Sequence, residues 1–477
     1  MNLVAHMLGV PGIDGQKPAI VTGEGVQVGF SELLGWSSRL ASAWKRAGVE
    51  KGDRVVIAMG LGPGLYAGLA ALWRLGAVAV LPEPAMGLAG LRHAARAATP
   101  KAYLTDGWFR ALGYALPELW RVPLTLTPGD GYTTSGDLLE EVEPDHPALI
   151  SFTSGSTGRP KSIMRTHGFL LNQNDVLKDL LAPERENETD LVAFPVFVLA
   201  NLGQGVTSLL PNWNLKKPHE ADAAKICDHI SAHRVTRALV PPSICEGLAA
   251  SGRDPGLATI FTGGGPVFPD LMERLAQNSR TRVVAVYGST EAEPIAHLEA
   301  SEIDAKDWEA MRTGAGLLAG KPIDAIRLEI LADEIVVTGG HVNKGYLDPD
   351  DDAATKIRRD GEIWHRTGDG GRLDASVRLW LTGRLDGRAA GLSPFCVEAA
   401  ARLWPGVRRC ALVDMDGTGI LAVEGDRAKL AEWKASAAAF GDLSVAPLRA
   451  IPFDLRHRSK VDYVRLKTAL RKQASAG

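Results

Sequence analysis

A polar loop at residues 151–162 is the feature that most restricts how this chain can fold. An apolar run at 147–150 precedes it and a second apolar run follows, so the pattern predicts a strand, a loop and a return strand. Hydroxyl side chains, glycines and Lys161 are typical of a loop whose backbone N–H groups surround an anion. Pro160 precedes the lysine, so the spacing differs from that of a P-loop. A flexible polar linker is the alternative.

The length and the hydrophobic pattern predict the fold class. The 477 residues indicate more than one domain, because single cores rarely grow beyond about 250–300 residues. Up to about residue 313, runs of strand length alternate with segments of helical periodicity, which predicts an α/β fold with a largely parallel sheet. The expected elements include helices at 30–47, 65–75, 90–98 and 200–210, and strands at 52–58, 77–81, 102–105 and 191–199.

The pattern changes in the last third of the chain. From about residue 314 it predicts short alternating strands of a small β-rich subdomain, at 326–330, 334–338, 361–367 and 377–382. Residues 387–477 mix strands with helical patterns at 393–403 and 428–439 and a basic helix at 459–472. We therefore expect a mixed α/β protein with a large N-terminal domain and a small α+β C-terminal domain.

Composition excludes several classes of function. A net charge of −3 gives no reason to expect a nucleic acid or an anionic membrane as partner. The four cysteines form no Cys-x-x-Cys pair, which disfavours a disulfide framework or a zinc site and fits a reducing cytoplasm. The N-terminus lacks the pattern of a signal peptide, and the most apolar window, 64–81, is interrupted by Arg74, so we expect no membrane span.

Five further segments carry side chains suited to nucleotide chemistry. Taken singly, each has a structural alternative: a tight turn after a strand, a carboxylate exposed at a turn, or a basic helix start in solvent. The segments are 262–266 (Thr-Gly-Gly-Gly-Pro), 287–291 (Tyr-Gly-Ser-Thr-Glu), 365–369 (His-Arg-Thr-Gly-Asp), 382–386 (Thr-Gly-Arg-Leu-Asp) and 456–460 (Arg-His-Arg-Ser-Lys).

Together with the polar loop, these segments resemble, in the same order, the motifs of the acyl-adenylate-forming superfamily. That superfamily includes acyl-CoA synthetases, luciferases and nonribosomal adenylation domains. The resemblance implies an N-terminal AMP-binding domain at 1–382, a hinge at 383–386 and a mobile C-terminal lid at 387–477. It also implies a reaction that joins a carboxylate to the α-phosphorus of ATP and releases pyrophosphate, with Mg²⁺ neutralising the phosphates.

The resemblance implies a role for each matching residue. Lys460 would bridge the attacking carboxylate and the α-phosphate, Thr290 would contact that phosphate, and Glu291 would be catalytic and hold Mg²⁺. Tyr287 would stack on adenine, and Asp369 would bind both ribose hydroxyls. The other implied nucleotide-binding residues are Thr153, Ser154, Gly155, Ser156, Thr157, Gly158, Lys161, Gly263, Gly264, Gly265, Gly288 and Arg384, and the implied hinge residue is Asp386.

At two places the sequence differs from the usual pattern of the superfamily, and these differences bear on which subgroup it resembles. Ser459 stands where the family commonly has glycine. The segment around Ser459 and those around Trp364 and Trp380 together are most similar to the β-lactone synthetases of olefin biosynthesis. In those enzymes the hydroxyl of a β-hydroxyacyl adenylate displaces AMP, and its tether gives it a high effective concentration. After Asp386 the chain also lacks the Ile-Lys strand usual in acyl-CoA ligases, so the use of CoA stays open.

The segment expected to line the acyl pocket is apolar. Phe194, Phe197, Leu199 and Leu202 favour a hydrophobic acid, and no early aspartate is present to hold an α-ammonium; core packing is the alternative. We expect ATP-dependent activation of a fatty or β-hydroxy fatty acid, then transfer to a thiol of CoA or an acyl carrier protein. β-Lactone closure is the alternative, and a luciferase-like oxidoreductase is a remote one. A non-catalytic nucleotide-binding regulator is disfavoured because Glu291, Asp369 and Lys460 occur together.

Overall fold

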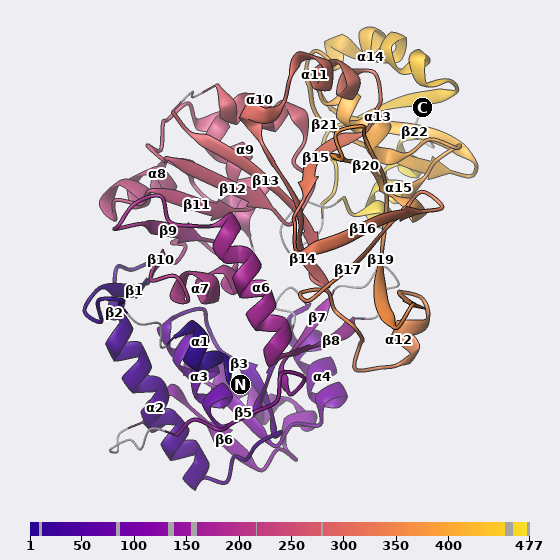
Figure 1. Cartoon of the computed structure of the whole chain (residues 1–477). Helices are drawn as coiled ribbons and strands as arrows, with labels where there is room; N and C mark the ends of the chain where they lie inside the picture. The colour runs from indigo at the N-terminus through magenta and orange to yellow at the C-terminus, as the bar shows by residue number, and fades with distance from the viewer. Residues whose placement is uncertain are drawn as a thin grey trace.

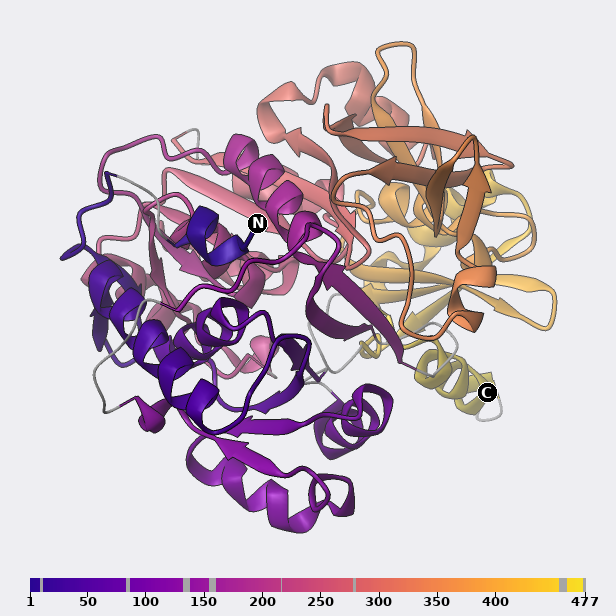
Figure 2. The same cartoon turned by 60° about the horizontal axis from the view of Figure 1, so that its bottom comes forward.

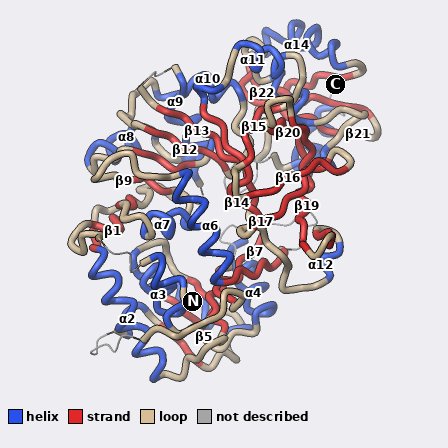
Figure 3. Tube along the Cα trace, viewed as in Figure 1, coloured by secondary structure: helices blue, strands red, loops and turns tan. Residues whose placement is uncertain are grey.

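The computed structural model describes residues 1–8, 12–82, 86–131, 138–153, 160–215, 217–277, 280–453 and 461–474. Within these ranges the chain forms two large mixed sheets layered with helices, and a small C-terminal sheet (Figure 1). Figure 3 shows helices around the strands of the N-terminal half, whereas strands from the last third of the chain lie along one side of the molecule. The expected α/β class is confirmed. No helix in the described ranges is long and apolar enough to cross a membrane.

The first sheet comes from the N-terminal third of the chain. Its order is β6-β5-β3-β4-β7-β8, and all neighbours are parallel except β7 and β8. Its strands are short runs of buried apolar residues, as expected when helices cover a parallel sheet. The bounds are β3 Arg54–Ala58, β4 Val78–Leu81, β5 Ala102–Thr105, β6 Leu124–Leu126, β7 Pro147–Thr153, β8 Lys161–Thr166, α2 Phe30–Arg46, α3 Pro63–Arg74, α4 Gly87–Ala98 and α5 Arg110–Ala115.

The second sheet begins with parallel strands in the order β13-β12-β11-β9-β10-β1, with β2 antiparallel at the edge. Helix α6 crosses the middle of the molecule and contacts both β8 of the first sheet and α7 of the second (Figure 1). The bounds are β1 Pro18–Val21, β2 Gln27–Gly29, α6 His167–Leu180, β9 Thr189–Val192, α7 Pro195–Leu202, β10 Thr207–Leu209, α8 Ala223–Ala232, β11 Arg237–Val240, α9 Pro242–Ser251, β12 Thr259–Gly263, α10 Pro269–Ala276 and β13 Arg282–Ser289.

The same sheet continues through antiparallel strands in the order β14-β15-β20-β19-β17-β16, with β18 paired to β19. These strands (orange) lie on one side of the molecule beside the C-terminal unit (yellow) (Figure 2). The bounds are β14 Ala292–Glu299, α11 Ala305–Arg312, β15 Leu317–Pro322, β16 Ile326–Leu331, β17 Glu334–Gly339, α12 Asp350–Ala353, β18 Lys356–Arg359, β19 Glu362–Leu373 and β20 Leu379–Arg384.

The C-terminal unit has its own sheet and core. Strands β21-β22-β23 pack between two groups of helices and bury Trp433, Leu412 and Val413. The expected basic helix at 459–472 is observed as α15, which begins at Tyr463; the residues 454–460 lie outside the described ranges. The bounds are α13 Pro394–Ala401, β21 Val407–Met415, β22 Thr418–Gly425, α14 Leu430–Ala437, β23 Leu443–Leu448 and α15 Tyr463–Ala474.

A buried ion cluster fixes the C-terminal unit against α9 and α10. Arg402, 4% exposed, donates to both carboxylate oxygens of Asp270 at 2.7 and 2.8 Å and to Glu246 at 3.1 Å. Arg409 donates to the other oxygen of Glu246 at 2.6 Å. Buried charges are costly unless they are paired, so the cluster holds β21 and the end of α13 in this orientation.

The prediction for residues 191–210 was wrong. A single apolar run suggested one strand at 191–199 and a helix at 200–210, but β9 ends at Val192 and α7 already begins at Pro195. Proline suits the first position of a helix, because its missing N–H would have no partner there and its φ is preset. The helix ends before Gly205, whose φ of +68° favours glycine, and β10 follows.

The N-terminal helix α1, Leu3–Met7, is attached to α6 through a buried histidine. The backbone N–H of Leu3 donates to Nδ1 of His167 at 3.2 Å, so this nitrogen must be unprotonated. Burial, then the neighbouring His146 and the N-terminal ammonium, lower the pKa of His167 to about 4. The unfolded chain therefore takes up this proton at a higher pH than the folded chain does, and stability falls as pH falls from about 6.5 toward 4.

We expect His167→Gln to remove part of this pH dependence. Glutamine keeps an acceptor for the Leu3 amide but does not titrate, so the loss of unfolding free energy between pH 7 and pH 5 should shrink by about 2 kcal/mol. Urea unfolding of both proteins at the two pH values measures it. His6→Gln, at an exposed histidine of α1, is the matched control. Between pH 7 and pH 5 it should lose as much unfolding free energy as the wild type does. An equal loss in His167→Gln would contradict the assignment.

Candidate active site

The segment 287–291 lies where β13 turns back into β14. Its backbone is held from two sides: buried Arg165 donates to the carbonyl oxygen of Thr290 at 2.6 Å, and the N–H of Asn343 donates to that of Glu291 at 2.7 Å. Tyr287 and Glu291, predicted from one motif, therefore have fixed positions at the end of a parallel strand, where ligands of open α/β sheets commonly bind.

Three predicted residues from distant segments meet beside this turn. The Tyr287 hydroxyl donates to Oδ2 of Asp369 at 2.8 Å, and Arg384 Nη1 lies 3.3 Å from Oδ1 of the same carboxylate. Burial and the charge of Asp369 raise the pKa of Tyr287 well above its usual value, so the phenol keeps its proton. Asp386 is next to this group, with Oδ1 3.5 Å from Nε of Arg384. A carboxylate accepts several hydrogen bonds, so Asp369 retains capacity for a ligand.

Glu291 is a charged carboxylate in a half-buried position. The Tyr346 hydroxyl donates to its Oε1 at 3.0 Å. Burial acts to raise the pKa of Glu291, but His365, the Tyr346 hydrogen bond and Lys356 outweigh it and lower the pKa below the usual value. No group of three or more His, Cys, Asp or Glu in the described ranges could hold a metal ion. Mg²⁺ commonly binds one or two carboxylates together with phosphates, and a single ionised Glu291 fits that mode.

Two lysines flank the Tyr346 ring near this carboxylate. Nζ of Lys161 lies 5.3 Å and Nζ of Lys356 5.2 Å from the ring centroid, within the range of a cation–π interaction. Lys356 donates to the Asn343 carbonyl and lies 3.2 Å from Nδ1 of His365. Burial lowers the pKa of Lys356 to about 8, and burial and Lys356 lower that of His365 to about 4. The side chains of these residues form a cationic region suited to phosphate.

Sequence reasoning gave no role to Lys356, Tyr346 or His365. Lys356 and His365 are cross-strand partners of β18 and β19, a register that spacing alone does not reveal. His365 could have been singled out, because it stands beside Trp364 at the start of the segment that ends in Asp369.

The glycine segment is required by close packing of two strands. Gly263 is paired with Val286 across β12 and β13, and a Cβ at Gly263 would lie 2.6 Å from the Val286 carbonyl oxygen. Gly264 has a φ of +74°, and a Cβ there would meet the Phe194 ring at 3.3 Å. Gly265 is half-buried just after them. A Cβ at Gly288 would lie 2.9 Å from the Ala292 carbonyl oxygen, inside the β13–β14 turn.

This glycine segment forms one wall of a pocket. The pocket lies between α7, the end of α6 and the parallel strands. Four predicted residues, two aromatic and two glycine, therefore share one pocket. The lining residues are Leu180, Leu181, Phe194, Phe197, Leu239, Phe261, Thr262, Gly263, Gly264, Val286 and Glu293.

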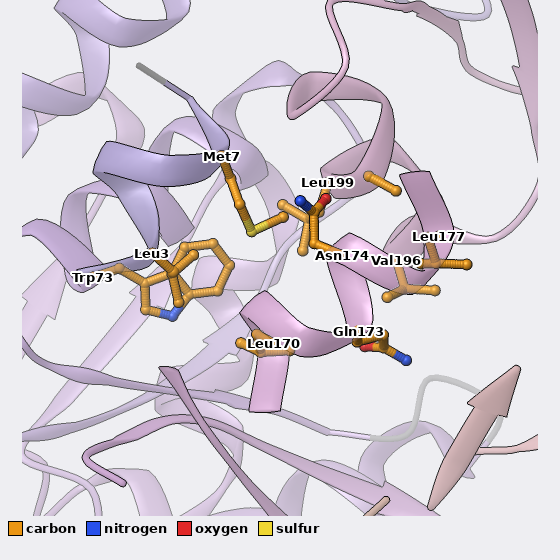
Figure 4. A pocket seen from close by; sticks show the side chains of 10 residues that line it. Leu3, Met7, Trp73, Leu170, Gln173, Asn174, Leu177, Val196 and Leu199 are labelled. Atoms are coloured by element: carbon orange, nitrogen blue, oxygen red, sulfur yellow. The ribbon is translucent and has the colours of Figure 1, made fainter. Parts of the chain in front are cut away.

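The other two predicted pocket residues lie elsewhere on α7. Leu199 lines a different pocket, together with side chains of α1, α3 and α6 such as Leu3, Trp73 and Asn174 (Figure 4). Leu202 is buried in the hydrophobic core. Phe197 and Leu199 line different pockets because residues two apart on a helix point in different directions.

Several predicted residues lie outside the described ranges: Ser154, Gly155, Ser156, Thr157, Gly158 and Lys460. The described ends of the loop are Thr153, which closes β7, and Lys161, its partner in β8. Phe453 and Val461 form an antiparallel bridge on either side of the segment that contains Lys460.

The fold and this cluster of residues define an enzyme of the adenylate-forming ligase and synthetase class. The chain belongs to the AMP-binding enzyme family, because residues 13–347 match the model of that family.

Curated relatives and solved structures agree with this class. The chain is 28% identical to the olefin beta-lactone synthetase of Stenotrophomonas maltophilia (strain K279a), over 91% of this chain and 90% of that protein. It is 31% identical to a feruloyl-CoA synthase of an Amycolatopsis species, over 82% of this chain and 81% of that protein. The amide bond synthetase McbA from Marinactinospora thermotolerans has the same fold, with a TM-score of 0.82, 23% identity, and coverage of 98% of this chain and 99% of that chain.

Gly263→Ala should destabilise the protein by about 1–3 kcal/mol, because the new methyl group must separate β12 from β13. The matched control is Gly247→Ala in α9, where a Cβ would meet no atom within 4 Å. That change should be neutral or stabilise by about 0.5–1 kcal/mol, since alanine is the better helix former. Denaturant midpoints of the two variants measure the difference, and equal midpoints would show that the strands do not need this glycine.

Proposed function

We propose that this enzyme activates a hydrophobic carboxylic acid with ATP to an acyl-adenylate and pyrophosphate, and then transfers the acyl group to a thiol. One observation carries the proposal. Gly263 and Gly264 line the apolar pocket one strand away from the Tyr287–Asp369 pair, so an acid in the pocket would lie near a nucleotide bound at that pair. The membership in the AMP-binding family and the synthetases among its relatives support it.

We assign the nucleoside to Tyr287, Gly263–Gly265, Gly288, Asp369 and Arg384. The glycines leave space for a flat base beside the backbone, against which the Tyr287 ring would stack. Asp369 would accept hydrogen bonds from both ribose hydroxyls, and Arg384, already beside it, would add a donor.

We assign the phosphates to the loop from Thr153 to Gly158, to Lys161 and to Thr290. Glu291 would hold Mg²⁺, which when bound neutralises phosphate charge. Lys460 would bring the acid carboxylate to the α-phosphorus: the carboxylate oxygen forms a bond to phosphorus, and pyrophosphate leaves with the electron pair of the broken bond.

We propose that residues 383–386 are a hinge between an N-terminal domain, 1–382, and a lid, 387–477. Asp386 would be the residue whose backbone rotates between the two half-reactions. In the orientation observed here, the ion cluster of Arg402 and Arg409 would have to open before the lid turns.

The thiol would be CoA or an acyl carrier protein, and the synthesis of fatty acyl derivatives would place the enzyme in fatty acid metabolism. The relative named as a feruloyl-CoA synthase supports CoA. All four cysteines are free thiols, which fits a reducing compartment, and we propose the cytoplasm.

β-Lactone closure is the second candidate. Similarity to an olefin beta-lactone synthetase covers 91% of this chain and 90% of that protein, and so extends into the lid region. In this reaction the β-hydroxyl oxygen of the adenylate would bond to the carbonyl carbon, the hydroxyl proton would go to a base, and AMP would leave with the electron pair of the acyl–oxygen bond.

Mass spectrometry of the products distinguishes the two second steps. The enzyme is incubated with ATP, Mg²⁺ and a 3-hydroxy fatty acid, with and without CoA, and with the unhydroxylated acid as control. We expect a CoA adduct from both acids. A product lighter than the hydroxy acid by one water, formed without CoA, would instead establish β-lactone closure and contradict thiol transfer.

Lys460→Ala should reduce pyrophosphate release by about 10²–10³-fold, because it removes a positive charge from the reacting groups. Circular dichroism should be unchanged. Lys472→Ala, at an exposed lysine in the last turn of α15, is the matched control and should keep full activity. Pyrophosphate release at the wild-type rate in Lys460→Ala would refute the role of this lysine.

A further inference from the structure

Among the described residues, the exposed aromatic side chains are gathered in one segment. They are Trp108, Tyr114 and Trp120, with exposed fractions of 67%, 84% and 67%. The segment, residues 107–121, begins with the 3₁₀ helix η2, Gly107–Phe109, and continues through α5 and the 3₁₀ helix η3, Pro117–Leu119. It has no part in the proposed adenylation site. Because large apolar side chains grouped at a protein surface mark a binding region, this aromatic segment is a candidate interaction surface.

One side of the aromatic segment is attached to the first sheet. The hydroxyl of Tyr103 in β5 donates to the carbonyl oxygen of Phe109 at 2.8 Å, and a Cβ added at Gly113 would lie 3.4 Å from the Tyr103 ring. Leu116 and Leu119 are buried in the same hydrophobic cluster as Tyr103. The exposed rings therefore extend from a folded backbone whose other side belongs to the core.

Two local contacts hold the exposed indole rings. Trp108 stacks on Phe109, with the ring centroids 4.1 Å apart. Nε1 of Trp120 donates to the carbonyl oxygen of Tyr114 at 2.9 Å, which places this indole beside the C-terminal end of α5. The polar atom of Trp120 is thereby satisfied within the protein, so its exposed surface is ring carbon. Tryptophan and tyrosine rings, apolar with one polar group, are the side chains that gather at the boundary between water and lipid.

The aromatic segment and the adjacent α4 are basic. From residue 92 to residue 121 the chain has five basic and two acidic residues, a net charge of +3, whereas the whole chain carries −3. Glu118 is shared by Arg92 at 3.3 Å and Arg96 at 2.5 Å, so it balances only one of these two charges. Arg110 and Arg121 are also exposed. The acidic charge of the whole chain therefore does not prevent attraction to an anionic surface at this place.

A lipid surface fits this combination of rings and charge better than a folded protein does. Figure 2 shows α5 at the lower edge of the molecule. A segment at an edge can enter the headgroup layer of a bilayer, which adapts to its shape, and helices that carry tryptophan and arginine bind in that layer. Anionic headgroups complement the positive charge of residues 92–121. Because no helix in the described ranges could cross a membrane, the contact would be peripheral.

We infer that the aromatic segment is a peripheral membrane-binding surface for a bilayer that contains anionic lipids. The rings of Trp108, Tyr114 and Trp120 enter the headgroup layer, and the arginines of the segment and of α4 bind anionic headgroups. The inference does not depend on the proposed chemistry. The two agree, because a hydrophobic acid partitions into bilayers, and an enzyme at the bilayer surface meets it at a raised local concentration.

The test is co-sedimentation of the full chain with vesicles of phosphatidylcholine alone and of an equal mixture with phosphatidylglycerol. The wild type should bind the mixed vesicles at least about 10-fold more tightly than the neutral ones. Trp108→Ser, Tyr114→Ser and Trp120→Ser combined should lower the partition coefficient by about 10–100-fold, because they remove the apolar surface that enters the bilayer. Arg110→Gln with Arg121→Gln should lower it by about 10-fold for the mixed vesicles only.

Leu331→Ser with Val464→Ser is the matched control, because it removes exposed apolar side chains outside the aromatic segment and should leave vesicle binding unchanged. Quenching by brominated phosphatidylcholine in the mixed vesicles gives a second readout. The two indoles of the segment, among eleven in the chain, should be quenched when the protein binds. This quenching should be absent from the triple serine variant, whose circular dichroism and ATP–pyrophosphate exchange in solution should match those of the wild type.

Three results would overturn the inference. The first is a wild-type protein that stays in the supernatant with the mixed vesicles. The second is a triple serine variant that sediments with them as the wild type does. The third is self-association without vesicle binding, detected as a mass that rises with protein concentration in the wild type but not in the triple variant, since the surface would then bind a second copy of the chain.

Discussion

The antiparallel turn from β13 to β14 is the constraint on which the site depends. It ends the parallel part of the large sheet and starts the antiparallel part, so the two parts form one continuous sheet. Asp369 of β19 can accept the Tyr287 hydroxyl only because the later strands of this sheet turn back toward β13. The turn also separates Tyr287, Glu291 and Glu293 into three different surroundings within seven residues.

Two buried arginines each pair with an aspartate of another element. Arg237 in β11 donates to both oxygens of Asp190 in β9 at 2.8 and 2.9 Å, and Arg402 forms its cluster between the C-terminal unit and α10. In both cases the guanidinium donates two hydrogen bonds to one carboxylate, and such a pair fixes the direction as well as the distance between the joined elements. Arg165 supports the site turn in a different way, through a hydrogen bond to the carbonyl oxygen of Thr290.

Local sequence predicted the helices and strands whose hydrophobic pattern fits only one kind of secondary structure. The helix expected at 30–47 is α2, Phe30–Arg46, and the strand at 102–105 is β5, because their periodicity and end signals agree. The run from 191 to 210 failed because a continuous apolar stretch fits a buried strand and a buried helix equally well. Pro195 is the signal that distinguishes the two, because it is the first residue of α7.

The sequence by itself determined the fold class and the identity of the family, because motif residues such as Tyr287, Glu291 and Asp369 are recognised by their order along the chain. Only the tertiary structure decided which side chains share a space. In the folded chain Lys356 lies over the Tyr346 ring, Leu199 and Phe197 line different pockets, and Glu293 lines the same pocket as Phe197. Spacing along a chain specifies local geometry, whereas cross-strand register and the direction in which a helix faces depend on packing against other segments.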